Sequence, residues 1–321
     1  MRLNNLVRLA VYDWSKGMPL PKRASLLLAT GGLGVGIGIL WTKASPAMGP
    51  RLIALTVMLL CCLFVMNAIV ASDLERKLDL EREQIAAREI QKYLQGREFP
   101  QFPGCEIAAL CRSSREVGGD YVDAVKLDSE RLMIVIADVS GKGAAAALLM
   151  ANLQAILRTL ALQGQSPQQI AVSIHAHLLR HSEPGRYATA FIGLLHRASR
   201  RLIYVNAGHE PPVLATPGAG TQRLGTGGPP LGLLPESDFE QGEIAVPANG
   251  VLLLYTDGIS ERTNRQGEFY GVNRLVHCLN AHPLPSASKI ADQLFEDSDK
   301  FAENCPASDD MALMVLRFTN L

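Results

Sequence analysis

The chain of 321 residues lacks the sequence patterns of several common protein classes. It has no stripe of lysine and arginine, and the part from residue 99 onward is net acidic. A nucleic-acid substrate is therefore not expected, because a phosphate backbone attracts basic side chains. The six cysteines form no C-x-x-C motif and no cysteine–histidine zinc spacing, which favours a reducing compartment. Walker and G-x-S-x-G motifs are also absent, which argues against a P-loop nucleotide site and a serine hydrolase.

Charged residues are missing from two long runs near the N-terminus, residues 24–41 and 52–71. As helices, the two runs would span about 27 and 30 Å, close to the hydrocarbon thickness of a bilayer. Residues 1–23 carry five basic side chains and one acidic side chain. This basic excess predicts a cytosolic N-terminus (1–23), a two-helix transmembrane hairpin (24–71) and a cytosolic remainder. A buried hairpin of a soluble protein is the alternative.

Residues 72–98 change to alternating charge, with apolar residues at roughly helical spacing. The pattern predicts a linker helix that begins with Ser72 or Asp73 as its N-cap and ends near Gly96. Two hypotheses remain open because the heptad pattern is imperfect. The helix pairs with a second copy in a homodimeric coiled coil, or it packs alone on its own domain. It is the covalent link between the hairpin and the rest, so we expect regulation to pass through it.

The part from residue 99 onward is rich in predicted strands. Strands are expected at residues 105–111, 121–126, 131–139, 187–196, 201–205, 212–215, 243–246, 251–256 and 311–318. Helices are expected at residues 143–162, 167–180, 271–280 and 286–302. Many strands with two pairs of helices predict an α+β fold in which helices cover a sandwich of sheets.

Four short acidic motifs are the most informative feature of this part. They are Gly118-Gly119-Asp120, the DVSGKG sequence at 138–143, Tyr255-Thr256-Asp257-Gly258 and Ser308-Asp309-Asp310. Three of them place an aspartate at the end of an apolar, strand-like run. Grouped aspartates repel one another unless a dication offsets their charge, so the pattern predicts a hard-metal site built from distant segments.

The spacing of the first two motifs predicts how their aspartates meet. If residues 121–126 and 131–137 form a hairpin with a three-residue loop, Asp120 lies opposite Asp138. Directly opposed side chains have Cβ atoms about 5 Å apart, so the two carboxylates would share one site. Asp123 would point to the other face of the strand, where a structural role is expected. A paired-carboxylate glycosidase has the same residues, but the neighbouring glycines favour a metal and a phosphate.

Together and in this order, the motifs resemble the SpoIIE-type branch of the type 2C (PPM) metal-dependent serine/threonine phosphatases. The resemblance covers residues 87–318 and includes AREIQKYL, REVGGDYVD, IADVSGKGAAAALLMA, YATAFIGLL, YVNAGHEPPVL, GGPPLGLL, LLLYTDGISERTN and SDDMALMVL. It implies that residues 99–321 form an αββα sandwich, two antiparallel sheets flanked by helices. It also implies a bacterial protein with a phosphoprotein partner, a STAS-type anti-sigma-factor antagonist or a similar phosphoprotein. Together with the hairpin predicted from the apolar runs, this predicts a multi-pass protein of the inner membrane with a cytosolic catalytic domain.

The resemblance also assigns roles to residues. Asp138 would bridge two Mn²⁺ or Mg²⁺ ions, with the carbonyl of Val139 as a further ligand. Asp120 would bind one ion, and Asp257 and Asp309 the other, with Asp310 the less favoured choice. A metal-activated water would then attack the phosphate, so no protein nucleophile is needed. No arginine is identified for gripping that phosphate, since Arg115 is near the first motif only in sequence.

The remaining candidates are weaker. His209 is expected to order its loop rather than act as a general acid. His175, His177 and His181 are not expected to bind zinc, and Lys142 either contacts a phosphate or faces solvent. Two alternative functions remain: a phosphatase-like scaffold that binds its partner without turnover, and a small-molecule phosphoesterase.

Overall fold

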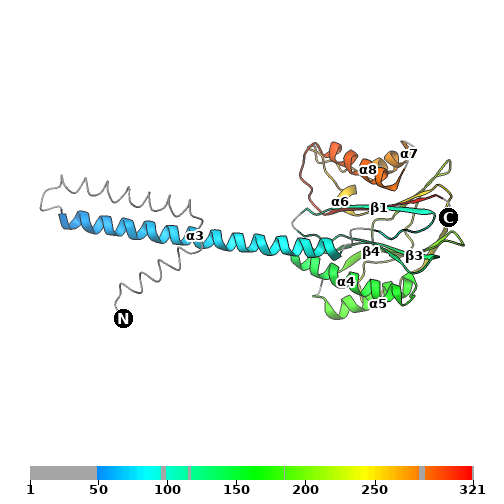
Figure 1. Cartoon of the computed structure of the whole chain (residues 1–321), viewed down its shortest axis with the longest axis horizontal. Coiled ribbons are helices and arrows are strands. Elements are labelled where there is room, and N and C mark those ends of the chain that lie inside the picture. Colours follow the sequence, from blue (N-terminus) through cyan, green and yellow to red (C-terminus); the bar gives the residue numbers. More distant parts are fainter. Residues whose placement is uncertain (1–48, 95–98, 115–116, 184, 282–285, 320–321) are drawn as a thin grey trace. The chain divides into compact units, whose positions relative to one another are not determined.

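The computed structural model describes residues 49–94, 99–114, 117–183, 185–281 and 286–319. The chain divides into two compact units, residues 1–83 and 84–321. The predicted membrane span at 24–41, Gly96 and Arg115 lie outside the described residues. Figure 1 shows the elements of the larger unit, in which helices lie on both outer faces of a pair of sheets.

Helix α3 (Gly49–Leu94) is continuous over 46 residues. It contains both the second apolar run and the predicted linker helix, so the predicted N-cap at Ser72 or Asp73 is wrong. The physical reason is that residues 51–94 contain no glycine or proline, so nothing ends the helix where its composition changes.

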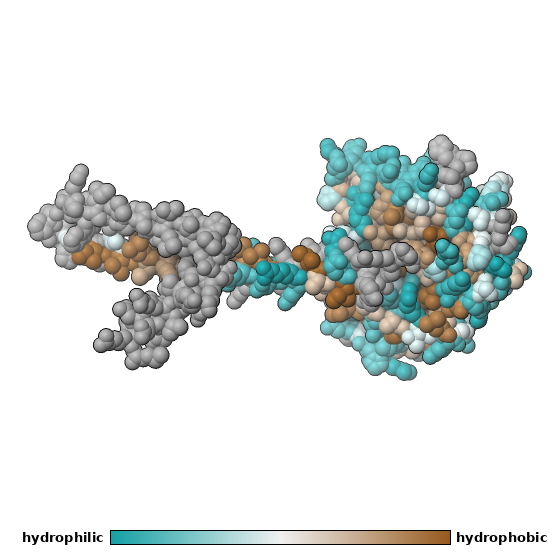
Figure 2. Space-filling model, in the orientation of Figure 1, coloured by the Kyte–Doolittle hydropathy of each residue, from teal (hydrophilic) through white to brown (hydrophobic). Residues whose placement is uncertain are grey.

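The first half of α3 carries large apolar side chains that are exposed, and Figure 2 shows them as brown surface. They are Ile53, Val57, Met58, Leu59, Phe64, Met66 and Val70. Among the residues whose side chains are described, α4 (Ala144–Leu162) is the one helix with the length and composition of a membrane span. Its apolar residues Met150, Leu153 and Leu157 are buried against a sheet, which accounts for that composition.

The larger unit contains two sheets. Sheet A has the order β1 (Cys105–Arg112), β11 (Met311–Phe318), β10 (Val251–Tyr255), β6 (Val213–Thr216) and β7 (Gly220–Arg223). Sheet B has the order β2 (Tyr121–Lys126), β3 (Arg131–Val139), β4 (Ala188–His196), β5 (Arg201–Ala207) and β8 (Gly227–Gly228), and β9 (Gly242–Ala245) also pairs with β5. All pairs are antiparallel except β5 with β8, which is parallel and only two residues long. The expectation of purely antiparallel sheets is therefore wrong at this one short pair.

The sheets stack face to face, with helices outside them. Helices α4 and α5 (Pro167–His181) cover sheet B, and α7 (Val272–Ala281) and α8 (Ala287–Ala302) cover sheet A. Strand β3 explains this layering, since Met133 and Val135 face the helices while Leu132 and Ile134 face the other sheet. A strand buried on both faces is apolar throughout, as the sequence of β3 is. The predicted α+β fold is confirmed.

Most predicted elements agree with the structure within one or two residues. Three short elements were not predicted from the sequence: β7, β8 and the single-turn helix α6 (Asp257–Ser260). Helix α6 was not predicted, because Asp257 was interpreted as a metal ligand in the turn that follows the strand expected at residues 251–256. The chain leaves β10 at Thr256, the N-cap, and turns at once into the helix.

Candidate active site

Asp120 and Asp138 meet at one end of sheet B. Tyr121 pairs with Ala137, which is the predicted hairpin register, so Asp120 immediately precedes β2 opposite Asp138 in β3. Burial, and then the neighbouring charge of Asp138, raises the pKa of Asp120 well above its usual value. The pKa of Asp138 rises to about 7, first through burial and then through the charges of Asp257 and other aspartates.

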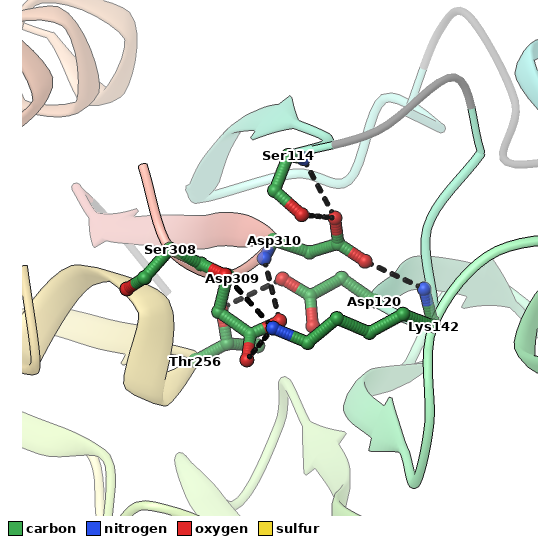
Figure 3. A network of polar contacts seen from close by, with 8 residues as sticks. Ser114, Asp120, Lys142, Thr256, Ser308, Asp309 and Asp310 are labelled. Carbon is green, nitrogen blue, oxygen red and sulfur yellow. Dashed lines mark hydrogen bonds and ion pairs between the residues drawn. The ribbon is translucent and has the colours of Figure 1, made fainter. Parts of the chain in front are cut away.

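Two segments of sheet A bring further carboxylates to the same place. Asp257 opens α6 directly after β10, and Asp309 lies just before β11. Burial, followed by the charge of Asp309, raises the pKa of Asp257. Thr256 connects this side to sheet B, because its Oγ1 donates a hydrogen bond of 2.8 Å to Oδ2 of Asp120 (Figure 3). Four aspartates from four distant segments therefore share one region of negative charge.

Lys142 supplies positive charge at the edge of this region. Its Nζ lies 2.8 Å from Oδ2 of Asp309 and donates to the carbonyl of Ser308 at 2.8 Å (Figure 3). The side chain is exposed, in line with the predicted solvent-facing alternative, and it also pairs with a site aspartate. Because this ion pair is partly exposed, it offsets only a small part of the charge of the cluster.

Asp310 has a different role from its neighbour Asp309. Its Oδ1 accepts hydrogen bonds from the backbone N and the Oγ of Ser114, at 2.7 and 3.0 Å. Its Oδ2 accepts from the backbone N of Gly119 at 2.8 Å (Figure 3). Asp310 thus connects the fourth motif to the first through hydrogen bonds. This role could not be predicted from the sequence, because nothing in it indicates which of the two adjacent aspartates points toward the first motif.

Two glycines allow the backbone to approach closely at the site. A Cβ atom on Gly119 would lie 2.7 Å from the carbonyl oxygen of Val139 and 3.4 Å from Oδ1 of Asp138. A Cβ atom on Gly258 would overlap the carbonyl oxygen of Asp310. Only a residue without a side chain fits at either position, which explains why glycine stands next to the aspartate in both motifs.

The donor set fits hard dications in its chemistry. Carboxylates and the Val139 carbonyl supply only oxygen, the ligand that Mg²⁺ and Mn²⁺ prefer. Burial, and then neighbouring negative charge, raises the pKa values of Asp120, Asp138 and Asp257, so a bound dication would stabilise their ionised forms. In the described part of the chain, no three acidic, histidine or cysteine side chains converge tightly enough to form a ready-made cage.

Other candidates from the sequence lie away from the carboxylates or serve the scaffold. Asp123 accepts two hydrogen bonds from Arg158, at 2.6 and 2.8 Å, and one from Tyr121, so its expected structural role is confirmed. His177 contacts Asn152 on the face formed by α4 and α5. His175 accepts from the backbone N of Gly232.

His209 is buried, and its ring Nδ1 lies 2.9 Å from Oγ1 of Thr189, the strand partner of Asp138. Burial lowers its pKa to about 4, so the ring is neutral at physiological pH. Its backbone N donates to the side chain of Asn206, in agreement with the expected loop-ordering role. The structure also adds Arg186, whose guanidinium donates to the Ser140 carbonyl at 3.2 Å beside the 140–143 turn. Nothing in the sequence around Arg186 indicated this contact.

The charge cluster predicts an unusual pH dependence for the metal-free protein. A folded-state pKa of about 7 for Asp138 lies above its unfolded value of 3.8, so the folded state binds the proton more tightly. The metal-free protein should therefore become less stable as the pH rises from about 4 to 7. Thermal unfolding in chelator at pH 5 and pH 8 measures this, and Asp138→Asn should reduce the difference. Equal pH dependence in both proteins would show that the charge of Asp138 does not destabilise the metal-free folded state.

The αββα fold and the carboxylate cluster together define the class of PP2C-type phosphatase domains. The sequence profile of the family described as Stage II sporulation protein E (SpoIIE) matches residues 128–319. This match covers more than half of the chain, and the protein belongs to the SpoIIE family. The predicted enzyme class, a serine/threonine protein phosphatase, is confirmed at the level of the family.

Named relatives agree with this assignment. Phosphoserine phosphatase RsbP of Bacillus subtilis is 33% identical over 192 residues, which are 58% of this chain and 47% of RsbP. Phosphoserine phosphatase RsbU of the same organism is 27% identical over 240 residues, 74% of this chain and 71% of RsbU. Protein IcfG of Synechocystis is 29% identical over 233 residues, 64% of this chain and 36% of IcfG. The chain thus spans half or less of the length of RsbP and IcfG.

Solved structures share the fold. The SiaA-PP2C domain of Pseudomonas aeruginosa aligns with a TM-score of 0.67 at 18% identity, over 76% of this chain and 98% of that domain. The RsbU and RsbW domains of Rv1364c from Mycobacterium tuberculosis align with a TM-score of 0.58 at 27% identity, over 69% of this chain and 62% of that one. The first of these supports the fold only.

Proposed function

We propose that this protein is a metal-dependent phosphatase that hydrolyses phosphoserine or phosphothreonine on a signalling protein. The observation that carries the proposal is the gathering of four aspartates at one end of two stacked sheets, where burial and neighbouring charge raise the pKa of Asp120, Asp138 and Asp257. Asp138 would hold two dications jointly, Asp120 one of them, and Asp257 and Asp309 the other, with the carbonyl of Val139 as a further ligand. Two bound Mn²⁺ or Mg²⁺ ions supply an activated water and stabilise negative charge on the phosphoryl oxygens.

The residues of the chain then have distinct tasks. Thr256 orients Asp120 through its hydrogen bond, and Asp310 holds the Gly119 backbone in place. Lys142 and Arg186 are cations beside the 140–143 turn, where an incoming phosphate would need partners. Neutral His209 keeps Thr189 fixed behind Asp138 and is not assigned a proton-transfer step.

We propose a phosphorylated STAS-type anti-sigma-factor antagonist, or a similar phosphoprotein, as the substrate. The support is the family resemblance and the names of the relatives: RsbU and RsbP are phosphoserine phosphatases, and Rv1364c contains RsbU and RsbW domains. A panel of phosphorylated STAS domains beside free phosphate esters tests this choice. Preferential turnover of the esters would favour a small-molecule phosphoesterase.

We further propose attachment to a bacterial inner membrane through the two apolar runs, with the catalytic domain in the cytosol. The support is the basic N-terminal segment, the length of the runs and the exposed apolar side chains of α3. A homodimer through the charged half of α3 remains a hypothesis. Membrane fractionation and light scattering in detergent test the two proposals.

Removing the metal is expected to abolish phosphate release from a phosphoprotein. The full chain should lose activity in EDTA and regain it with Mn²⁺ or Mg²⁺, because the proposed nucleophile is a metal-activated water. A malachite-green assay of phosphate measures the effect. Activity that survives EDTA would contradict the mechanism, and partner binding without any metal-dependent turnover would favour the scaffold.

A further inference from the structure

Gln91 is a buried polar residue near the end of helix α3. Its side chain is 6% exposed and makes two hydrogen bonds to the backbone of one residue, Gly118. Its Nε2 donates to the Gly118 carbonyl at 2.7 Å, and its Oε1 accepts from the Gly118 N–H at 3.1 Å. The amide therefore satisfies both polar groups of a buried glycine 27 residues away in the sequence.

The loop held by Gln91 leads directly to the carboxylate cluster. Gly119 follows Gly118, and its N–H donates to Asp310. The backbone of Gly119 also packs against the Val139 carbonyl, since a Cβ atom there would lie only 2.7 Å from that oxygen. Asp120 is the next residue. Two residues, each fixed through its backbone, thus separate the Gln91 amide from Asp120.

We propose that Gln91 is a positioning residue of the active site. It holds the 118–120 loop so that Asp120 and the Val139 carbonyl lie where a dication is bound. The inference rests on the proposed function, in that it takes these two groups as metal ligands. It makes the last turns of α3 part of the catalytic unit, because Gln91 satisfies both backbone polar groups of Gly118.

The type of residue fits this role. A neutral amide has a donor and an acceptor on one planar group, matching the N–H and the carbonyl of one residue. It adds no charge beside the carboxylates. A side chain that lacks both groups would leave two buried backbone groups unpaired, which is costly and favours movement of the loop.

The test compares Gln91→Met with Arg88→Met in the full chain. Methionine keeps the length and helix propensity of Gln91 and removes both hydrogen bonds. Arg88 is exposed on the same helix, so its variant is the matched control. Mn²⁺ affinity is measured by calorimetry, amide exchange of residues 117–120 by mass spectrometry in the metal-free protein, and folding by thermal unfolding.

Gln91→Met is expected to weaken Mn²⁺ binding at least tenfold and to speed exchange at Gly118 and Gly119, while Arg88→Met changes neither. Gln91→Asn keeps a neutral amide on a side chain that is one methylene shorter, so it serves as a milder variant if the methionine variant does not fold. The proposal is overturned if the Gln91 variants bind Mn²⁺ and exchange like the wild type, or if Arg88→Met has the same effect. A wild-type chain that binds Mn²⁺ but hydrolyses no phosphoprotein would refute the proposed function alone, and the affinities would still decide the role of Gln91.

Discussion

Asp138→Asn is expected to reduce metal-dependent phosphate release by about a thousandfold or more. Asp138 lies within the cluster, because it is opposite Asp120 in the register of β2 and β3, and its pKa is raised by burial and then by the charges of Asp257, Asp309 and Asp310. An amide there cannot offer the negative charge with which Asp138 would hold the two proposed dications. Losing several kcal/mol of electrostatic stabilisation corresponds to about three powers of ten in rate. Phosphate release at saturating Mn²⁺, with calorimetry of Mn²⁺ binding, measures the loss.

The folded state of this variant should remain intact. With one repelling charge removed, metal-free Asp138→Asn should unfold at a higher temperature than the metal-free wild type. Asp128→Asn is the matched control, because Asp128 lies in the exposed turn of the same hairpin and pairs only with its neighbours. If Asp138→Asn kept more than a tenth of wild-type turnover, the central role of Asp138 would be wrong.

Gly258→Ala is expected to destabilise the larger unit by about 3 kcal/mol or more, at the upper end of the cost of overpacking. The new methyl group would overlap the carbonyl oxygen of Asp310. Neither group can move away, because the methyl group is attached to the backbone of α6 and the carbonyl belongs to the backbone just before β11, and this junction is buried. This corresponds to a fall of roughly 10 °C in Tm. Since Asp257 and Asp309 flank the overlap, Mn²⁺ binding should weaken as well.

Gly225→Ala is the matched control for this prediction. Gly225 is exposed, and a Cβ atom there would meet nothing nearer than Pro211, at 3.9 Å. Its Tm and Mn²⁺ affinity should therefore stay close to those of the wild type. If circular dichroism gave equal Tm values for the two variants, the close approach at Gly258 would have no energetic consequence.

The sequence alone predicted much of the fold, because local patterns determine it. The apolar run of β3 predicts a strand, and the length of the turn predicts the hairpin register that places Asp120 opposite Asp138. Three elements of two to four residues, β7, β8 and α6, were missed because they are too short to show a period, although β6 and β9, of four residues each, were predicted. The break expected at Ser72 was wrong, since a change of composition does not end a helix that has no breaker.

The candidate site, like the fold, could be predicted from the sequence only in part. Aspartates at strand ends are visible in the sequence, and the structure brings four of them together. The residues that orient them are not visible, because their partners are distant: Asp310 reaches Ser114 across 196 positions and Thr256 reaches Asp120 across 136. Adjacent aspartates are chemically identical on paper, and only the fold distinguishes Asp309, which faces Lys142, from Asp310, which binds backbone.

The position of β11 has a consequence for synthesis of the protein. This strand lies between β1 and β10 in sheet A and follows every other described element in the sequence. While the ribosome still holds it, β1 has no partner strand, and Asp309 and Asp310 are missing from the site. The nascent chain therefore cannot bring its four site aspartates together until the segment around β11 has left the ribosome, so sheet A stays incomplete until that point.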